Sequence, residues 1–266
     1  MIKVNQEEIK VGYFPDQTLL LKHRTKGNIE VNKIYWYFEN NEELIAVYFL
    51  SKHLREHGVR KLDLVMPYIP NARQDRVKRE EDIFTLKYFS EMLNGMGFDH
   101  VYVLDPHSDV ACALIDRVKK LPVAPYIEEA IRRSGINKEK DIIFYPDSGS
   151  QKRYAEMILF PNAFGIKRRD WESGEIKGLD VAGEIPKKPF NVLIVDDISS
   201  FGGTFYFSAK KLKELGAEKI YLYVTHCENS ILEGKLIESG LVDEIYTTDS
   251  IFTKEHELIK VITLDL

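Results

Sequence analysis

Cysteines are scarce in this chain, and long apolar runs are absent. Cys112 and Cys227 are the two cysteines among 266 residues, and each lies alone among apolar neighbours without CxxC spacing. We therefore expect two buried thiols rather than a disulfide or a zinc site. The longest apolar runs, such as 62–66 and 192–195, have the length of strands and fall short of the roughly 20 residues that span a bilayer, so no membrane partner is expected.

An excess of positive charge is missing as well. Lys and Arg number 37 against 42 Asp and Glu, which leaves a net charge of -5. Because binding to nucleic-acid phosphates needs a cationic excess, no nucleic-acid partner is expected. The opening residues MIKVNQEEIK carry charges where a secretory signal peptide has its apolar run, which predicts a cytoplasmic protein. A hydrophobic share of 44% excludes an intrinsically disordered chain.

Strand-length apolar runs alternate with segments of helical period. This alternation predicts an α/β fold of mainly parallel sheets flanked by helices. At about 150 residues per domain the chain accommodates two domains, and the prolines of segment 121–125 predict the boundary between residues 1–123 and 124–266. The predicted strands are 62–66, 101–105, 142–147, 192–197 and 220–226, and the predicted helices are 42–57, 84–93 and 204–215. The side chains predicted to face the core from these helices are Leu44, Val47, Tyr48, Leu54, Leu86, Phe89, Leu93, Phe207, Leu212 and Leu215.

Polar residues follow most of the predicted strands. Four of the five end in Asp or His, and in a doubly wound sheet the carboxyl ends of the strands form the edge where ligands bind. One long polar segment, 168–189, has no periodic pattern. A loop of this length in a compact enzyme is typical of a lid, which is the interpretation that we favour over a disordered excursion.

Residues 192–204, VLIVDDISSFGGT, combine an apolar strand, two adjacent carboxylates, a small-residue turn and the start of a helix. The amides of the turn and the positive end of the helix suit an anion such as phosphate, and Gly202 and Gly203 permit its close approach. Asp196 and Asp197 suit ribose hydroxyls or a hydrated Mg²⁺. The alternative is an ordinary strand–turn–helix in which an Asp caps the helix.

A second polar group follows the strand at 62–66. Arg73, Gln74 and Asp75 offer a bidentate cation, an amide and a carboxylate, a set that can hold the phosphates and base of a nucleotide. The alternative is a surface loop with a salt bridge.

Two further candidates are a histidine and a basic run. His107 lies just beyond the strand that ends at Asp105, where a lone His is more often a packed or surface residue than a ligand. Residues 167–169, Lys-Arg-Arg, open the long polar segment. A charge run is ordinarily a solvated face, but cations beside a phosphate site are what phosphoryl transfer needs.

Several stretches carry a family resemblance. Residues 66–77, MPYIPNARQDRV, match a PYxxxARQDR stretch, and the others are DPHS at 105–108, YPDSG at 145–149, IKRR at 166–169, TH at 225–226 and YTTDSI at 246–251. Together with 192–204, in this order, they resemble the ribose-phosphate pyrophosphokinases, or PRPP synthetases, which have the type I phosphoribosyltransferase fold. Ordinary phosphoribosyltransferases lack the ARQDR stretch.

The resemblance implies an activity and a set of site residues. It implies an ATP-binding pyrophosphokinase domain over 1–123 and a phosphoribosyltransferase-like domain with the ribose and phosphate loop over 124–266. The implied reaction is Mg²⁺-dependent transfer of the β,γ-diphosphate of ATP to the C1 hydroxyl of ribose 5-phosphate, giving PRPP and AMP. The implied ATP-binding residues are Phe14, Asp16, Arg73, Gln74, Asp75 and His107, and the implied ribose- and phosphate-binding residues are Asp147, Asp196, Asp197, Ser200, Phe201, Gly202, Gly203 and Thr204. Lys167 and Arg169 are implied to stabilise the transition state, and His107 and Asp147 to hold the metal.

The chain departs from the family pattern at several points. The family has an Asp and a Thr where this chain has Ser200 and Phe201, which weakens the expected grip on a 5-phosphate dianion. An aromatic ring there can stack on a base, so we also consider a 5-substituted acceptor such as ADP-ribose, which would give ADP-ribose 1-diphosphate in NAD metabolism. Thr18 replaces the acid of the family's FSDGE segment, which approaches the ATP of a neighbouring subunit. Because few residues precede this segment and the family's usual last helix is cut short, we expect a homodimer or a higher homo-oligomer without the family's full assembly and regulation.

Two other functions stay open at this stage. One is a phosphoribosyltransferase that consumes PRPP, against which the ARQDR and KRR stretches argue. The other is a catalytically inactive, nucleotide-binding associated subunit, against which the presence of His107, Asp147, Lys167 and Arg169 argues.

Overall fold

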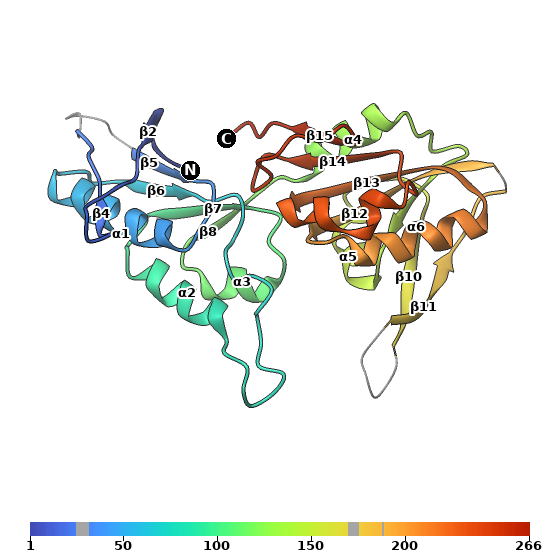
Figure 1. Ribbon diagram of the computed structural model, residues 1–266, viewed down its shortest axis with the longest axis horizontal. Coiled ribbons are helices and arrows are strands. Elements are labelled where there is room, and N and C mark those ends of the chain that lie inside the picture. Colours follow the sequence, from blue (N-terminus) through green and yellow to red (C-terminus); the bar gives the residue numbers. More distant parts are fainter. Residues whose placement is uncertain (25–31, 170–175, 188) are drawn as a thin grey trace. The chain divides into compact units, whose positions relative to one another are not determined.

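The computed structural model describes residues 1–24, 32–169, 176–187 and 189–266, with the backbone alone at 167–169, 176 and 177. The chain forms two compact units, Met1–Pro122 together with Leu266, and Val123–Asp265. Each is built on its own mainly parallel sheet flanked by helices (Figure 1), so the predicted fold class is confirmed. No helix among these residues is long and apolar enough to cross a bilayer.

The first unit contains a six-stranded sheet in the order β2-β1-β5-β6-β7-β8. Its strands are β1 (Ile2–Val4), β2 (Glu7–Ile9), β5 (Asn32–Trp36), β6 (Leu62–Val65), β7 (His100–Leu104) and β8 (Val118–Leu121), and a separate hairpin pairs β3 (Gly12–Tyr13) with β4 (Leu19–Leu20). Strands β5 to β8 are parallel, whereas β1 pairs antiparallel with both β2 and β5. The helices are α1 (Glu42–Glu56), α2 (Thr85–Asn94) and α3 (Asp109–Leu114), and buried side chains of α1 and α2 share one core with the sheet.

The second unit contains a seven-stranded sheet in the order β11-β10-β9-β12-β13-β14-β15. Its strands are β9 (Ile142–Tyr145), β10 (Asn162–Arg169), β11 (Ile176–Gly183), β12 (Phe190–Ser199), β13 (Ala217–Cys227), β14 (Glu244–Thr248) and β15 (Ile259–Ile262), and its helices are α4 (Ala124–Ser134), α5 (Ser148–Tyr154), α6 (Gly203–Leu215), the 3₁₀ helix η1 (Asn229–Glu233) and α7 (Lys235–Glu238). All neighbouring strands are parallel except β10 and β11. One face of this sheet packs on α6 through Phe205, Ala209 and Leu212.

All five predicted strands and all three predicted helices are present. They correspond to β6, β7, β9, β12 and β13 and to α1, α2 and α6. The prolines near residue 122 lie where β8 ends at Leu121 and α4 begins at Ala124, with Pro125 in the first helical turn, where its missing amide proton costs nothing.

Two of the predicted core side chains are wrong. Tyr48 of α1 and Phe207 of α6 are 43% and 41% exposed. Helix α6 instead buries Phe205, Ser208 and Ala209, which lie three and four residues apart on one face. Phe207 lies two residues from Phe205, on another side of the helix, and is therefore left toward solvent.

The prediction of one long loop over 168–189 is also wrong. Residues 176–183 form strand β11, which pairs antiparallel with β10 in the register Lys167 to Leu179. Leu179 is buried, and a Cβ at Gly165, whose partner in the register is Val181, would lie 2.9 Å from the Leu179 side chain. The glycines and Asp of β11 are poor strand formers, which is why its sequence reads as a loop. Cys112 differs from expectation too, because it is half-buried, whereas Cys227 is buried as predicted.

Candidate functional site

The strand β12 ends in a turn that leads directly into α6 (Figure 1). We call residues Ser200–Thr204 the anion loop. Its Gly202 has φ 74° and forms the N-cap of α6, and this N-cap residue makes no side-chain capping hydrogen bond. The N-cap of α6 is therefore a glycine, and the alternative in which an Asp occupies the N-cap within residues 192–204 is wrong. Amides at a helix N-terminus are suited to hold a phosphate oxygen.

Asp196 and Asp197 lie next to one another at the end of β12. Asp197 is 4% exposed, and its Oδ2 forms an ion pair with Nη1 of Arg153 in α5 at 3.0 Å. The amide of Asp197 donates to Oδ1 of Asp196 at 3.0 Å. Burial, followed by the negative charge of Asp197 and, more weakly, that of Asp147, raises the pKa of Asp196 well above its ordinary value.

Asp147 lies at the same edge of the sheet because β9 and β12 are parallel neighbours. It is the N-cap of α5, where its Oδ1 accepts hydrogen bonds from the amides of Gly149 and Ser150 at 3.0 and 3.1 Å. A carboxylate that is fixed in this way is presented at the sheet edge in one orientation. The second unit thus brings together three of the predicted carboxylates.

The remaining loop residues differ in exposure. The ring of Phe201 is 55% exposed, whereas Gly202 is buried and Gly203 is exposed. The Ser200 hydroxyl lies 3.4 Å from that of Ser230. An exposed apolar ring directly before the helix N-terminus offers a flat surface beside the anion loop, with no hydroxyl to donate to a phosphate.

The first unit groups four of the predicted ATP-binding residues near the carboxyl ends of β6 and β7. Asp75 is buried, and its Oδ1 and Oδ2 accept hydrogen bonds of 2.7 and 3.0 Å from Nε and Nη2 of Arg76. The hydrogen bond from Arg76 lowers the pKa of Asp75, and the charge of His107 adds a smaller contribution. The salt bridge of the alternative interpretation is therefore present, while Arg73 and Gln74 expose their side chains beside it.

The backbone beside His107 is strained. Asp105, the residue after β7, is buried and has φ 41°, a conformation that costs energy for any residue other than glycine. Such a bend directs the chain from β7 into the His107 segment. The strain was invisible in the sequence because Asp105 looks there like an ordinary strand end.

The hairpin of β3 and β4 carries the other two predicted ATP-binding residues. Phe14 is exposed, and Oδ1 of Asp16 accepts hydrogen bonds from the hydroxyl and the amide of Thr18 at 2.7 and 3.1 Å. These bonds lower the pKa of Asp16, so it stays ionised. Phe14 and Asp16 thus form a rigid, solvent-facing turn in this chain.

Two predicted catalytic residues have only their backbone described. Lys167 and Arg169 lie on β10, opposite Leu179 and Ile176 of β11, and their side chains are outside the described residues. Within the described part of the chain, no three His, Cys, Asp or Glu side chains form a metal cluster by themselves.

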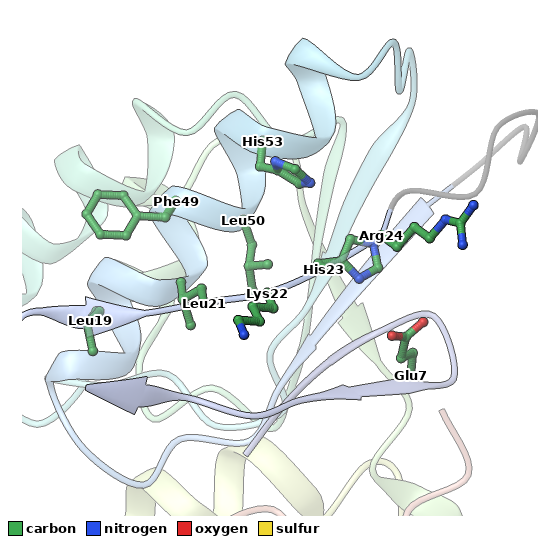
Figure 2. Close-up of a pocket in the computed structure, with 9 residues that line it drawn as sticks. All are labelled: Glu7, Leu19, Leu21, Lys22, His23, Arg24, Phe49, Leu50 and His53. Atoms are coloured by element: carbon green, nitrogen blue, oxygen red, sulfur yellow. The ribbon is translucent and has the colours of Figure 1, made fainter. Parts of the chain in front are cut away.

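A cavity of about 710 Å³ in the first unit is separate from these residues (Figure 2). Its wall combines Leu19, Leu21 and Leu50 with His23 and His53, whose rings meet edge to face at 6.2 Å. None of the predicted site residues lines this cavity.

Sequence comparison identifies the family. The profile of the "N-terminal domain of ribose phosphate pyrophosphokinase" matches residues 2–97, and that of the "Phosphoribosyl synthetase-associated domain" matches residues 172–266. The ribose-phosphate pyrophosphokinase of Pyrococcus furiosus is 32% identical over 254 residues, which cover 92% of this chain and 86% of the relative. The chain belongs to the ribose-phosphate pyrophosphokinase family. The family's enzyme of Pyrococcus abyssi is 31% identical over 94% of this chain and 86% of its own length.

The fold agrees with this membership. The crystal structure of the phosphoribosylpyrophosphate synthetase of Mycobacterium smegmatis superposes with a TM-score of 0.77 at 19% identity, covering 96% of this chain and 86% of that one. As a member of the ribose-phosphate pyrophosphokinases, the chain is a diphosphotransferase of nucleotide biosynthesis. The resemblance drawn from the sequence motifs is therefore confirmed.

One residue of the site escaped the sequence analysis. Arg153 is the cation that pairs with Asp197. No short-range pattern indicates this, since 43 residues separate the two in the chain and only the pairing of β9 with β12 places α5 beside the end of β12.

Proposed function

We propose that this chain transfers the β,γ-diphosphate of ATP to the C1 hydroxyl of a ribose phosphate and releases AMP. The observation that carries the proposal is the juxtaposition, in the second unit, of three carboxylates with an anion loop whose helix N-terminus has no side-chain cap. Carboxylates suit the ribose hydroxyls and the loop suits the phosphate at the other end of the sugar. Membership of the ribose-phosphate pyrophosphokinase family supports ATP as the diphosphate donor.

The reaction needs positioning more than covalent chemistry. The C1 oxygen forms a bond to the β-phosphorus, the bond from that phosphorus to the α,β-bridging oxygen breaks, and AMP leaves with this oxygen, while the hydroxyl proton passes to water. Asp196 and Asp197 would accept hydrogen bonds from the 2- and 3-hydroxyls, and the anion loop would fix the 5-end. Lys167 and Arg169 would stabilise the charge that builds on the phosphate oxygens.

Mg²⁺ fits the donor set of this chain. Burial, followed by the charges of Asp197 and Asp147, raises the pKa of Asp196, and a divalent cation beside these carboxylates would offset their charge. Mg²⁺ prefers one or two carboxylates together with substrate phosphates. Asp147 in the second unit and His107 in the first are the residues that we propose for metal binding, each within its own unit, and Mg²⁺ would neutralise the phosphates of ATP.

We further propose that the ribose acceptor carries a group on its 5-phosphate, as ADP-ribose does. The exposed ring of Phe201 stands where the family has a Thr, and Ser200 where it has an Asp. A ring cannot bond to a phosphate dianion, but it can stack on a base. The unsubstituted acceptor with which ADP-ribose should be compared is ribose 5-phosphate.

The test is an acceptor screen. The protein is incubated with ATP, Mg²⁺ and either ribose 5-phosphate or ADP-ribose, and AMP and the diphosphorylated product are quantified by chromatography and mass spectrometry. We expect AMP with an acceptor and a higher kcat/KM for ADP-ribose. AMP released equally without any acceptor would contradict the transfer, and pyrophosphate released from PRPP on addition of a base would indicate a phosphoribosyltransferase instead. Binding of ATP without AMP release for any acceptor would indicate an inactive nucleotide-binding subunit.

A further inference from the structure

The segment after β13 lies directly against the anion loop. We call residues Glu228–Leu236, which include η1, the brace. The amide of Glu228 donates to the carbonyl of Ser199 at 2.8 Å, at the point where β12 ends. The hydroxyl of Ser230 lies 3.4 Å from that of Ser200 and donates to the Glu228 carboxylate at 3.2 Å. The brace therefore holds the start of the anion loop through polar contacts.

Contacts with the middle of the loop are steric. A Cβ built on Gly202 would lie 3.1 Å from the side chain of Leu236, so the brace and the loop pack without space between them. A Cβ built on Gly234 would lie 1.9 Å from the carbonyl oxygen of Phe201 and 2.7 Å from its carbonyl carbon. Gly234 has φ −94° and ψ 148°, which any residue can adopt. Glycine is thus required here for space and not for backbone conformation.

This contact sets the direction of one peptide group in the loop. The carbonyl of Phe201 faces Gly234 in the brace. Because the carbonyl and the N–H of a trans peptide point in opposite directions, the amide of Gly202 is directed away from the brace. An anion at the N-terminus of α6 is bound by amides that face it, so the orientation of this peptide decides whether the loop presents a donor or an acceptor oxygen to the anion.

We propose that the brace positions the anion loop for the 5-phosphate end of the acceptor, and that Gly234 is the positioning residue on which this depends. The inference rests on the proposed function for the identity of the ligand. It assigns a role to a segment outside the site residues expected from the sequence. Gly234 itself touches no substrate, because its contact is with the Phe201 carbonyl on the side of the loop that faces the brace.

A substitution that adds a side chain at position 234 tests whether the brace positions the anion loop. Real Cβ atoms essentially never approach another atom closer than 3.0 Å, so Gly234→Ala must move the Phe201 carbonyl, or the brace, by more than 1 Å. A displacement of about 1 Å in a substrate-positioning element can lower kcat/KM by about 100-fold. We expect kcat/KM for the acceptor to fall by about 100-fold, mostly through KM, while KM for ATP stays within about twofold.

The matched control is Gly95→Ala. Gly95 follows α2 with ordinary helical angles, and its Cβ would meet carbonyl oxygens at 3.4 and 3.5 Å, which is close to normal contact. This variant is expected to keep wild-type KM values for ATP and acceptor. Thermal unfolding of both variants shows whether each is folded at the temperature of the assay.

The outcomes separate the inference from the proposed function. A folded Gly234→Ala variant with an unchanged KM for the acceptor, or with equal losses for ATP and acceptor, overturns the role of the brace. If this variant does not fold, Ser230→Ala replaces it; loss of its hydrogen bonds should raise the acceptor KM by about 2- to 10-fold, and no change overturns the inference. If the wild type releases no AMP with any acceptor, the proposed function fails. The role of the brace is then tested by calorimetric binding of ribose 5-phosphate to the wild type and to Gly234→Ala. Equal affinity of the two proteins, or no binding to the wild type, overturns this role.

Discussion

The guanidinium of Arg153 in α5 lies 3.0 Å from the carboxylate of Asp197 at the end of β12. Asp197 is almost fully buried beside a second carboxylate, Asp196, so the pair would place two negative charges in one poorly hydrated site. Arg153 offsets one of them. The pair of carboxylates thus stays available for ribose hydroxyls, with a cation 3.0 Å from Asp197.

Arg153→Met is expected to weaken both folding and acceptor binding. Removing one partner of a partly buried pair leaves Asp197 uncompensated, which costs on the order of 1–3 kcal/mol, between the values for exposed and fully buried pairs. We expect unfolding at lower urea concentration and a 10- to 100-fold loss in kcat/KM for the acceptor, in line with that energy. Arg153→Lys keeps the charge but not the planar fork, so partial rescue is expected.

Arg132→Met is the matched control for this variant. Arg132 pairs with Glu129 through two short hydrogen bonds on α4, but its side chain is 72% exposed. An exposed pair contributes about 0–1 kcal/mol, so stability should change little and activity not at all. Equal effects of the two methionine variants would show that the Arg153 pair has no special role at the site.

The fold was predictable where local pattern and burial agree, and less so where they conflict. β6, β9 and β12 are buried on both faces, so their apolar runs mark them clearly. β11 is different, because Gly178, Asp180 and Gly183 are weak strand formers and the strand exists through its pairing with β10. Phe207 shows the same limit for a helix, since apolar character alone does not tell which face meets the sheet.

Some residues of the site could likewise be predicted from the sequence, and others could not. Asp196, Asp197 and the glycines of the anion loop are adjacent in sequence, so their chemistry could be recognised from one segment. Arg153 and Gly234 belong to the same region only through folding: one reaches it from α5 and the other from the segment after β13. Nothing in the residues around either position indicates a phosphate or a ribose. Partners supplied by distant elements are the part that sequence reasoning could not find.

Thiol labelling tests the core of the second unit. Burial raises the pKa of Cys227 to about 12, so at pH 8 the reactive thiolate is about one part in 10⁴. Cys112 is half-buried and should account for the thiol that reacts with a disulfide reagent in the native protein. Both should react once guanidinium unfolds the chain. Cys112→Ser should abolish labelling of the native protein. If Cys227 is labelled in the native variant at a rate that does not rise steeply with pH, Cys227 is not buried.

The family resemblance assigns Lys167 and Arg169 to the transition state, and this makes a specific kinetic prediction. Lys167→Ala should lower kcat by 100-fold or more and leave the KM for ATP within about threefold, because a contact that forms mainly in the transition state contributes little to ground-state binding. Arg168→Ala, between the two, is the matched control and should retain most activity. Steady-state AMP release by the wild type and the two variants is the measurement. A higher KM for ATP, or an equal loss of activity in Arg168→Ala, would contradict this role. It would show that the basic run only attracts phosphates by its charge.

Phe201→Thr should reverse the acceptor preference. The ring is 55% exposed, so its replacement removes little buried surface and should leave stability nearly unchanged. A Thr hydroxyl can donate to a phosphate dianion, and a hydrogen bond to a charged group is worth about 1.5–3 kcal/mol, so KM for ribose 5-phosphate should fall by about tenfold or more. Loss of stacking, at about 1–3 kcal/mol per base, should raise KM for ADP-ribose by a similar factor.

The variant Phe201→Leu separates the two effects, because it removes the aromatic face without adding a hydroxyl. It should weaken the binding of ADP-ribose alone. Parallel changes for both acceptors in Phe201→Thr would mean that the ring does not select the acceptor, and the 5-substituent would then have to be recognised by residues outside the anion loop.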